Sequence, residues 1–413
     1  MANETRLGYY SPMKSRGTKS STDTAGKRKK PTATPVRSSK NANLGAARAN
    51  KNDEFYTQWV DIEREMGAYL DYDPDVFRDK VILLPCDDPE WSNFTKYFAL
   101  HFAELGIRKL ISTSFAPDSK PAEITYQPTL FELEDPKFDE IKTRSRGKKF
   151  ILEPQDLTGD GLINIDDLRW EYLEGDGDFR SDEVKKIRNE ADIVITNPPF
   201  SLFREFLAWI IEGEVRFSTI GPRNSISYKE VFPLIQEGKL WLGKGFAKGD
   251  AYFRVPASNA GNYATGVYDP STQMVHFRNT VWLTNLDHGR RHEQLQLMTM
   301  KDNITFSKHK EVRGIGYRKY VNHDAIEVPY TDSIPSDYDG AMGVPISFLD
   351  KYNPDQFEIL GSSGDLGKPM SQVAEKGTYV QGGPSFYIAN DDGTYTRLYK
   401  RIVIRNRRKA NRK

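Results

Sequence analysis

The stretch from residue 80 to residue 113 constrains the fold more than any other part of the chain. Residues 80–85 form a compact apolar strand, and apolar side chains recur at helical spacing over residues 92–105. Residues 109–113 then have the composition of a second buried strand. A strand, a helix and a strand joined by a connection of this length predict a parallel βαβ unit, in which helices cover both faces of the sheet.

The same alternation returns after residue 180. Ser181 has the side chain of a helix N-cap, and the two acidic residues after it complement the dipole of a helix that ends at Glu190. Residues 191–196 form another buried strand, and helical spacing resumes over residues 202–211. Further strands are expected at 217–220 and 280–284, with a helix at 228–236. The pattern predicts an α/β fold with a doubly wound, Rossmann-like sheet over residues 53–300.

The remaining residues divide into three regions. Residues 1–50 are rich in Ser, Thr, Lys, Ala and Pro and lack apolar periodicity, so we expect a disordered basic tail. Residues 301–396 are rich in Gly, Pro, Asp and Tyr, with short extended stretches at 356–360 and 378–380, which predicts a mixed or mostly β region. Residues 397–413 are expected to form a basic C-terminal strand, alternating as far as residue 404, and a tail.

Charge is segregated along the chain. The net charge is +1, but residues 1–50 carry +9 and residues 397–413 carry +9, which leaves −17 for the residues between. An acidic body with two basic arms favours a polyanionic partner gripped by the arms and by selected surfaces. The alternative is that the arms are solvated and only aid solubility.

Two further features limit the class of protein. The longest apolar runs, such as 206–211, are far shorter than the roughly 20 residues that span a bilayer, which excludes a membrane protein. The N-terminus lacks the apolar segment of a secretory signal, and the single cysteine, Cys86, cannot form an intramolecular disulfide. We therefore expect a cytoplasmic protein.

The motif Asn197-Pro-Pro-Phe200 carries the clearest chemical signal, and it directly follows a buried strand. An exocyclic amine is a poor nucleophile until acceptors hold its N–H groups and let the nitrogen pyramidalise. The Asn197 side-chain oxygen and the Pro198 carbonyl can supply two acceptors, Pro199 fixes the backbone, and Phe200 can stack on the ring that carries the amine. The alternative is a plain Asn-Pro turn that closes the strand.

This motif and the segments around it resemble those of the S-adenosylmethionine-dependent N6-adenine DNA methyltransferases, and more closely the EcoRI-type modification methylases. The similar segments are Lys51-Asn-Asp-Glu-Phe-Tyr-Thr57, Cys86-Asp-Asp-Pro-Glu-Trp-Ser-Asn-Phe94, Gly175-Asp-Gly-Asp-Phe-Arg-Ser181, Asn197-Pro-Pro-Phe-Ser-Leu-Phe-Arg204, Ile220-Gly-Pro-Arg-Asn-Ser225, Trp282-Leu-Thr-Asn-Leu286 and Tyr338-Asp-Gly-Ala-Met-Gly-Val-Pro345. The resemblance covers residues 52 to about 361. It implies a methyltransferase sheet followed by a target-recognition region at 301–396.

The resemblance also implies individual site residues. Phe55, Tyr56 and Thr57 occupy the place of the family's N-terminal cofactor motif. Asp87, Asp88 and Pro89 follow the first strand, where either carboxylate can accept hydrogen bonds from the ammonium of S-adenosylmethionine. Asp178 and Phe179 match the position that meets the target adenine, together with Phe200. Contacts with the DNA backbone are expected from Lys27, Arg28, Lys29, Lys30, Arg290, Arg291, Arg407, Arg408 and Lys409.

The resemblance thus implies a site-specific enzyme that methylates N6 of an adenine flipped out of double-stranded DNA. No metal is needed for this reaction. A monomer is expected, with a cognate restriction endonuclease as a separate partner. The alternatives are an N-methyltransferase acting on RNA or protein glutamine, and an inactive DNA-binding protein on the same fold.

Other motifs offer competing interpretations. Asp156, Thr158, Asp160 and Asp167 fall at positions 1, 3, 5 and 12 of a calcium-binding loop, but we expect a Gly-Asp-Gly hairpin that binds no metal. Pro85-Cys86 resembles the nucleophile of cytosine-C5 methyltransferases, but Cys86 follows the first strand and not the strand that precedes Asn197. We therefore expect a small buried thiol. His288 and His292 are expected to be surface or phosphate-facing residues beside Arg290 and Arg291.

Overall fold

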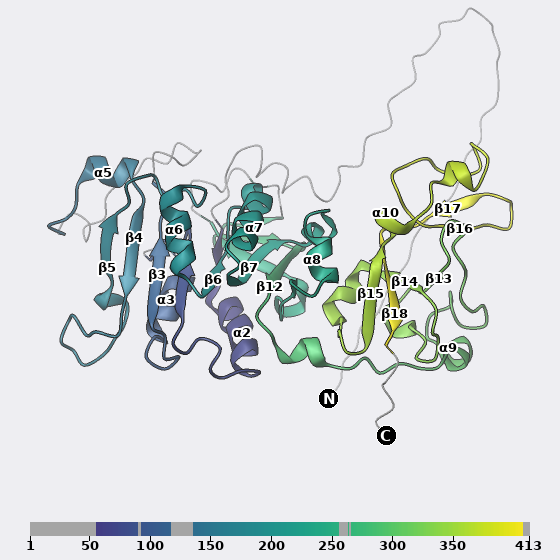
Figure 1. Ribbon diagram of the computed structural model, residues 1–413, viewed down its shortest axis with the longest axis horizontal. Coiled ribbons are helices and arrows are strands. Elements are labelled where there is room, and N and C mark those ends of the chain that lie inside the picture. The colour runs from purple at the N-terminus through teal and green to yellow at the C-terminus, as the bar shows by residue number, and fades with distance from the viewer. Residues whose placement is uncertain (1–54, 90–91, 117–134, 256–262, 264–265, 408–413) are drawn as a thin grey trace, which may run out of the picture. The chain divides into compact units, whose positions relative to one another are not determined.

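The computed structural model describes residues 55–89, 92–116, 135–255, 263 and 266–407. These residues belong to the compact unit Asn43–Lys413 and form a mixed α/β structure with four β-sheets in the described part (Figure 1). None of the helices in the described part is long and apolar enough to cross a membrane.

The largest sheet has eight strands in the order β5-β4-β3-β2-β6-β7-β12-β8. Its four inner strands β3, β2, β6 and β7 are parallel, while β4, β5 and β12 run antiparallel to their neighbours. The strands are β2 (Val81–Leu84), β3 (Lys109–Thr113), β4 (Lys148–Leu152), β5 (Arg169–Tyr172), β6 (Ile193–Thr196), β7 (Arg216–Pro222), β8 (Trp241–Leu242) and β12 (Thr280–Thr284).

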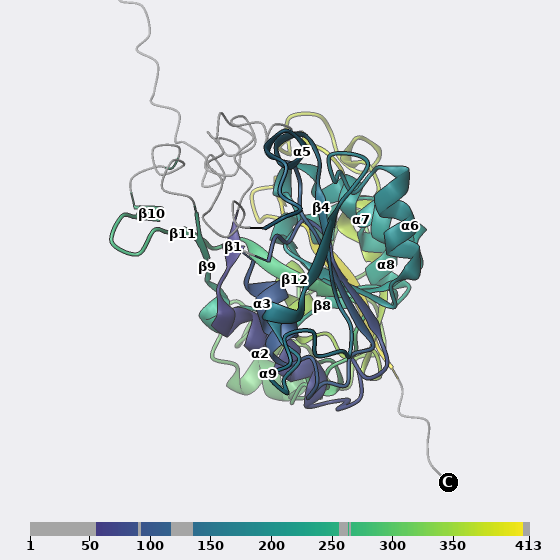
Figure 2. The ribbon, with the colours of Figure 1, turned by 90° about the vertical axis from the view of Figure 1, so that its left-hand side faces the viewer.

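Helices cover both faces of this sheet, because its central strands are apolar on both sides. Every residue of β2 and β6 is buried. Ile82 and Leu84 pack in one cluster with α2 (Trp59–Leu70) and α3 (Asn93–Leu100). Leu83 and Val194 pack in another cluster with α6 (Asp182–Glu190), α7 (Phe203–Glu212) and α8 (Phe232–Gln236). Figure 2 shows α2 and α3 on one side of the strands and the other three helices on the opposite side.

Strand direction gives the sheet two distinct edges. The parallel strands β2, β3, β6 and β7 all end at one of them, which we call the carboxyl edge. Strand β12 begins there, with Thr280 opposite Pro222, and ends with Thr284 opposite Ser218. The residues after β12 therefore lie at the opposite edge, which we call the amino edge.

A second sheet packs at the carboxyl edge. It has the order β1-β9-β11-β10, formed by β1 (Tyr56–Thr57), β9 (Ala251–Arg254), β10 (Tyr268–Asp269) and β11 (Met274–Phe277). Burial alternates along β9 and β11 because Phe253, Val275 and Phe277 face inward while Tyr252 and Arg254 face outward. The inward side chains join the hydrophobic cluster that contains Phe200.

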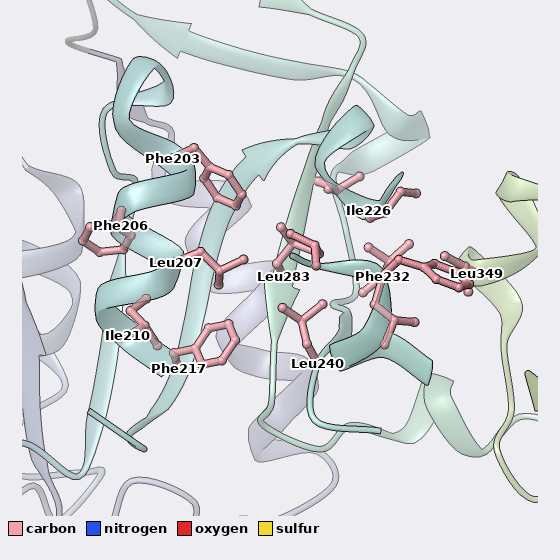
Figure 3. Close-up of a cluster of buried hydrophobic side chains, with 14 of the residues drawn as sticks. Phe203, Phe206, Leu207, Ile210, Phe217, Ile226, Phe232, Leu240, Leu283 and Leu349 are labelled. Atoms are coloured by element: carbon pink, nitrogen blue, oxygen red, sulfur yellow. The ribbon is translucent and has the colours of Figure 1, made fainter. Parts of the chain in front are cut away.

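The C-terminal region contains a four-stranded sheet, a two-stranded sheet and two short helices. The elements are β13 (Ile326–Glu327), β14 (Met342–Pro345), β15 (Phe357–Ser362), β18 (Arg401–Asn406), β16 (Tyr387–Ala389), β17 (Tyr395–Arg397), α9 (Met300–Phe306) and α10 (Ser363–Leu366). The core is continuous with that of the large sheet, as Figure 3 shows from Phe203 and Phe217 through Leu283 and Phe232 to Leu349.

Most elements that the sequence predicts are confirmed. The parallel βαβ unit is formed by β2, α3 and β3, and Ser181 caps α6 by accepting a hydrogen bond from the Val184 amide. The helix predicted over 228–236 is shorter, because α8 starts at Phe232 beside Pro233. The strand predicted at 378–380 is wrong, since Tyr379 makes only an isolated bridge to Tyr395. The C-terminal strand ends at Asn406 and not at residue 404.

Candidate active site

Three segments converge at the carboxyl edge. Residues 85–89 follow β2, Asn197-Pro-Pro-Phe200 follows the neighbouring strand β6, and the 3₁₀ helix η4 (Arg223–Ser227) follows β7. Strand β1 reaches the same place, since the Asn197 side chain donates to the Phe55 carbonyl. The structure therefore brings together the catalytic motif and the two segments predicted to hold the cofactor.

The amide of Asn197 is held in one orientation. Its Nδ2 donates a hydrogen bond of 2.7 Å to the Phe55 carbonyl oxygen, so its Oδ1 must point elsewhere. That Oδ1 is buried and has no hydrogen-bond partner. Buried acceptors are almost always satisfied, and an unsatisfied one at the end of a sheet strand marks a position where a ligand donor fits.

Three aromatic rings pack around Phe200 of the Asn197-Pro-Pro-Phe200 motif. The Phe200 ring lies 5.4 Å from that of Phe55, stacked at an interplanar angle of 28°, and contacts Phe253 and Phe277 at 6.1 and 6.4 Å. Phe200 is only 2% exposed. The face that could hold an adenine is thus covered by Phe55 in this structure, so stacking on a base requires the two rings to separate.

Asp87 ties the strand ends together. Its Oδ1 accepts from the Ser92 hydroxyl at 2.7 Å and its Oδ2 from the Thr196 hydroxyl at 2.5 Å, while its carbonyl accepts from Thr95 at 3.1 Å. Burial raises the pKa of Asp87 from 3.8 to about 7, against the lowering effect of these hydroxyls. The side chain therefore links β2, α3 and β6, and both of its oxygens already accept hydrogen bonds.

The other predicted cofactor residues lie around this link. Thr57 is buried, and its hydroxyl has no hydrogen-bond partner, while its carbonyl accepts from Asn93 at 2.8 Å. Asp88 and Tyr56 are half-buried and Pro89 is buried. The unsatisfied Thr57 hydroxyl is a second polar atom, beside the Asn197 oxygen, that fits a ligand at this edge. The indole nitrogens of Trp209 and Trp282 are also buried and unpartnered. Unlike Asn197 and Thr57, these two residues belong to the hydrophobic core, so we assign no ligand to them.

The loop predicted to meet the target adenine is held near the end of β3. The Asp176 carbonyl accepts from the Ala116 amide at 2.8 Å. Asp178 is half-buried and forms an ion pair of 2.6 Å with Arg180, whose hydrogen bonds lower the Asp178 pKa. The Phe179 ring is buried against Phe206 and Trp209 of α7, so this placement does not support its predicted contact with adenine.

The direction of β12 does not support the predicted phosphate contacts of Arg290 and Arg291. Both residues follow β12 and lie at the amino edge, away from Asn197. Arg290 donates to the Lys244 carbonyl at 2.6 Å, and the Arg291 guanidinium lies 3.8 Å from the Trp241 ring centroid. Their cations therefore serve internal contacts.

The histidines of this segment are also placed differently from the prediction. His288 is buried, with its Nε2 2.9 Å from the Leu242 carbonyl, so the expectation of a surface position is wrong. Burial lowers its pKa. His292 is half-buried, pairs with Asp287 at 2.9 Å and stacks on Tyr72.

Of the phosphate contacts predicted in the basic arms, only Arg407 lies within the described residues. Its Nε donates to the Phe357 carbonyl at 3.2 Å, which fixes it at the end of β18. The predicted contacts at Lys27, Arg28, Lys29, Lys30, Arg408 and Lys409 lie outside the described residues.

The remaining motifs form no metal site in the described part of the chain. No three His, Cys, Asp or Glu side chains come together there to hold an ion. In the 156–167 loop, Asp156 accepts from the amides of Gly159 and Gly161, and Asp167 accepts from those of Leu157 and Thr158. These carboxylates therefore close the loop on its own backbone. Cys86 is half-buried and packs against the core beside β2.

Several residues of this edge were not predicted from the sequence. Thr95 and Thr196, which donate to Asp87, belong to no motif, and Ser92, although it lies in a segment similar to the family, carries no predicted role. The inward-facing Phe253 and Phe277 lie in the stretches 251–254 and 274–277, where apolar residues alternate with Tyr, Arg or His, and this alternation could have predicted two strands.

Comparison with known proteins agrees with this geometry. Residues 43–407 match the family model described as "Adenine-specific methyltransferase EcoRI". The chain is 38% identical to the Type II methyltransferase M.EcoRI of Escherichia coli, across 90% of this chain and 99% of that protein. It is 29% identical to the Type II methyltransferase M.MpnI of Mycoplasma pneumoniae, across 87% and 97%. It is 31% identical to the Type II methyltransferase M.MgeORF184P of Mycoplasma genitalium, across 76% and 84%. No solved structure matches.

The fold and the site therefore define an amino-methyltransferase, an enzyme that requires a methyl donor. The chain belongs to the EcoRI family of adenine-specific methyltransferases, and it is a site-specific DNA adenine methyltransferase.

Proposed function

We propose that the enzyme transfers a methyl group from S-adenosylmethionine to N6 of an adenine flipped out of double-stranded DNA. The observation that carries the proposal is the Asn197 amide, whose oxygen is buried and unpartnered while its nitrogen is held by the Phe55 carbonyl. This arrangement leaves an acceptor, and not a donor, pointing from the catalytic strand.

An acceptor is what adenine N6 needs. The lone pair of the amine is conjugated with the ring, and it becomes nucleophilic when its two N–H groups donate to fixed oxygens. Asn197 Oδ1 and the Pro198 carbonyl supply these two oxygens, and Pro199 holds the backbone between them and Phe200. Because the acceptors are positioned before the substrate arrives, little reorganisation remains for the reaction itself.

The residues near Asp87 fit S-adenosylmethionine, which supplies an electrophilic methyl group when bound. The unpartnered Thr57 hydroxyl is available for a hydrogen bond, and Phe55, Tyr56 and Pro89 supply apolar surface. Asp87 and Asp88 are the two carboxylates that can accept from the cofactor's ammonium, and Asp87 also accepts from Ser92 and Thr196. We infer that Asp87 positions the strand ends.

The sheet topology supports a doubly wound, Rossmann-like arrangement. From β2 the chain crosses over to β3 on one side, and from β6 it crosses over to β7 on the other side. The strand order thus reverses between β2 and β6, which is where ligands bind in open α/β sheets. The hydrogen bond between Asp87 and Thr196 spans this switch point.

We further infer how the substrate is held. The DNA lies across the carboxyl edge, and flipping the adenine costs a few kcal/mol, offset by contacts with Phe200 after it separates from Phe55. Asp178, which lies in the loop beside the end of β3, is retained as a contact for the flipped base.

Residues 301–396 form the target-recognition region after a catalytic domain at 53–300, between basic arms at 1–50 and 397–413. The enzyme acts as a cytoplasmic monomer, and a cognate restriction endonuclease acts separately.

The test is Asn197→Ala, with Asn189→Ala as the matched control because Asn189 is exposed on α6. Loss of the acceptor should lower the methylation rate by on the order of 10² or more while S-adenosylmethionine still binds with nearly unchanged affinity. Methylation is measured as methyl transfer to DNA, and cofactor binding by calorimetry. Near wild-type turnover of Asn197→Ala would show that Asn197 is not the acceptor.

A further inference from the structure

We propose that Tyr399 stacks on a DNA base where the duplex is opened, within a basic and aromatic surface at the carboxyl edge. This surface, the Tyr399 patch, consists of Arg204, Tyr228, Lys229, Arg397, Tyr399 and Lys400. The inference rests on the proposed function, because it requires DNA to lie across that edge.

Tyr399 is exceptionally exposed for an aromatic residue. Its side chain is 91% exposed, the largest value for a large hydrophobic residue in the described part of the chain. The backbone on both sides is nevertheless fixed, since the Leu398 amide donates to the Phe386 carbonyl at 2.9 Å and Arg401 forms an ion pair of 2.7 Å with Glu327. The ring therefore projects into solvent from a firmly held segment.

That segment is attached to the catalytic sheet. The Lys400 ammonium donates a hydrogen bond of 3.0 Å to the carbonyl of Ser227, the last residue of η4. Helix η4 directly follows β7, and β7 is the sheet neighbour of the strand that carries Asn197. The link places the attachment point of Tyr399 at the same edge as the catalytic motif.

A second contact holds this junction. Arg223, the first residue of η4, forms a bidentate pair with Asp350 of the C-terminal region, with distances of 2.9 and 3.0 Å. Two separate polar links thus connect η4 with the chain after residue 300, one at Asp350 and one at Lys400, so the patch has a fixed backbone on both of its sides.

The charge around the ring suits phosphates. The Arg204 guanidinium lies 4.0 Å from the Tyr228 ring centroid, next to Ser227, and the Lys229 side chain is 90% exposed. Of the neighbouring carboxylates, Glu205 pairs with Arg180, Glu230 lies 3.7 Å from Lys229, and Asp365 accepts from the Ser362 hydroxyl and keeps its charge. The four cations Arg204, Lys229, Arg397 and Lys400 outnumber the two acids that remain, Glu230 and Asp365. A concentration of cations on an otherwise acidic body attracts DNA to this surface.

The chemistry of base flipping gives the exposed ring a partner. Removing an adenine from the stack leaves its neighbours with uncovered faces, and an aromatic side chain can cover one of them without reading sequence. A duplex opened at the target therefore presents a flat apolar base face on which the exposed Tyr399 ring can stack.

The test compares Tyr399→Ala and Tyr399→Phe with the control Tyr72→Ala. Tyr72 is 46% exposed and stacks on His292 at the amino edge. The probe is a duplex that contains the sequence methylated by the wild-type enzyme, and its Kd is measured by fluorescence anisotropy at several salt concentrations. We expect Tyr399→Ala to raise Kd about tenfold without changing the salt slope, since stacking involves no phosphate. Tyr399→Phe and Tyr72→Ala should bind within about twofold of wild type.

Two outcomes would overturn the proposal. One is wild-type Kd for Tyr399→Ala, and the other is a defect of Tyr399→Phe as large as that of Tyr399→Ala, which would assign the effect to the hydroxyl. An unchanged melting temperature of each variant shows that the fold is intact. Failure of the proposed function is distinguishable, because the wild-type enzyme would then leave adenine unmethylated, whatever the Tyr399 variants bind.

Discussion

The two edges of the large sheet each carry a basic cluster beside aromatic rings, and they use these residues differently. At the amino edge, Arg291 lies on Trp241 and Arg290 bonds to the Lys244 carbonyl, so both cations serve the protein itself. At the carboxyl edge, Lys400 fixes a segment from which Tyr399 projects into solvent.

Strand direction, and not local composition, therefore determines which basic cluster lies where a substrate can bind. Arg290 and Arg291 stand out in the sequence because they are adjacent and follow an apolar strand. They lie far along the chain from Asn197 and also at the wrong edge, because β12 is antiparallel to β7. The cations near the site come from α7, from the segment that follows η4, and from the segment between β17 and β18.

The largest effect that would sharpen this comparison is expected for Asn197→Asp. The second oxygen of the carboxylate would take the place of the nitrogen that now donates to Phe55, and two acceptors would face each other at about the present 2.7 Å. The rate should fall by on the order of 10³ at pH 8. Protonation restores a donor, so the ratio of variant to wild-type rate should rise as the pH falls.

The measurement is single-turnover methylation from pH 5.5 to pH 8.5 for both proteins. A variant with a wild-type rate, or a rate ratio independent of pH, would contradict the orientation assigned to the Asn197 amide.

The next effect concerns stability at the carboxyl edge. The pKa of Asp87 is about 7 in the folded protein because of burial, above its ordinary 3.8. Between these pH values the folded protein keeps a proton that the unfolded chain has released, so the free energy of unfolding decreases as the pH rises. Asp87→Asn lacks this dependence and should gain up to about 4 kcal/mol relative to wild type from pH 4 to pH 7.

Urea denaturation at a series of pH values checks this prediction. If the free energies of unfolding of wild type and Asp87→Asn change in parallel between pH 4 and pH 7, burial does not raise this pKa.

A smaller effect is expected for Phe200→Leu. Because Phe200 is buried among three other aromatic rings, replacement by Ala would unfold part of the core, whereas Leu should cost less than about 1.5 kcal/mol of stability. Productive DNA binding should weaken by about 1–3 kcal/mol because the stacking is reduced. A duplex with the target adenine mismatched should recover part of this binding energy, since flipping then costs less. Equal defects on paired and mismatched duplexes would argue against the stacking of Phe200 on the base.

The smallest effect contrasts the arms with the amino edge. Deleting residues 1–50, or residues 408–413, should flatten the dependence of log K on log salt by roughly 0.9 for each phosphate that the arm no longer neutralises. The C-terminal cut begins after Arg407 because β18 extends to Asn406. Arg290→Met and Arg291→Met should leave the slope unchanged. A flatter slope for the two arginine variants would place DNA at the amino edge and break the comparison.

The sequence predicts the fully buried strands of the large sheet well and its partly buried strands poorly, for physical reasons. Buried parallel strands such as β2 and β6 are continuous apolar runs between helices with clear caps, so their positions follow from periodicity. Strands β4 and β5 are only partly buried, with polar residues between, and they carry no such signal.

The site divides in the same way. Asn197 and Phe200 are found from a motif. The hydrogen bonds that hold Asp87 come from the hydroxyls of Ser92, Thr95 and Thr196, and no pattern in the sequence predicts them. Phe179 is the opposite case. It matches a family position beside Asp178, but its ring packs against Phe206 in the core and does not face the site. Spacing along the chain does not reveal which face of a loop is buried.

The central claim is that the acceptor at the end of β6 drives methylation of adenine N6 at one DNA sequence. It is tested most directly by sequencing that detects modified bases, on DNA from cells that express the wild-type protein or Asn197→Ala. We expect N6-methyladenine at a single recognition sequence with the wild-type protein and none with the variant. Methylation of another base, or equal adenine methylation by the variant, would contradict it.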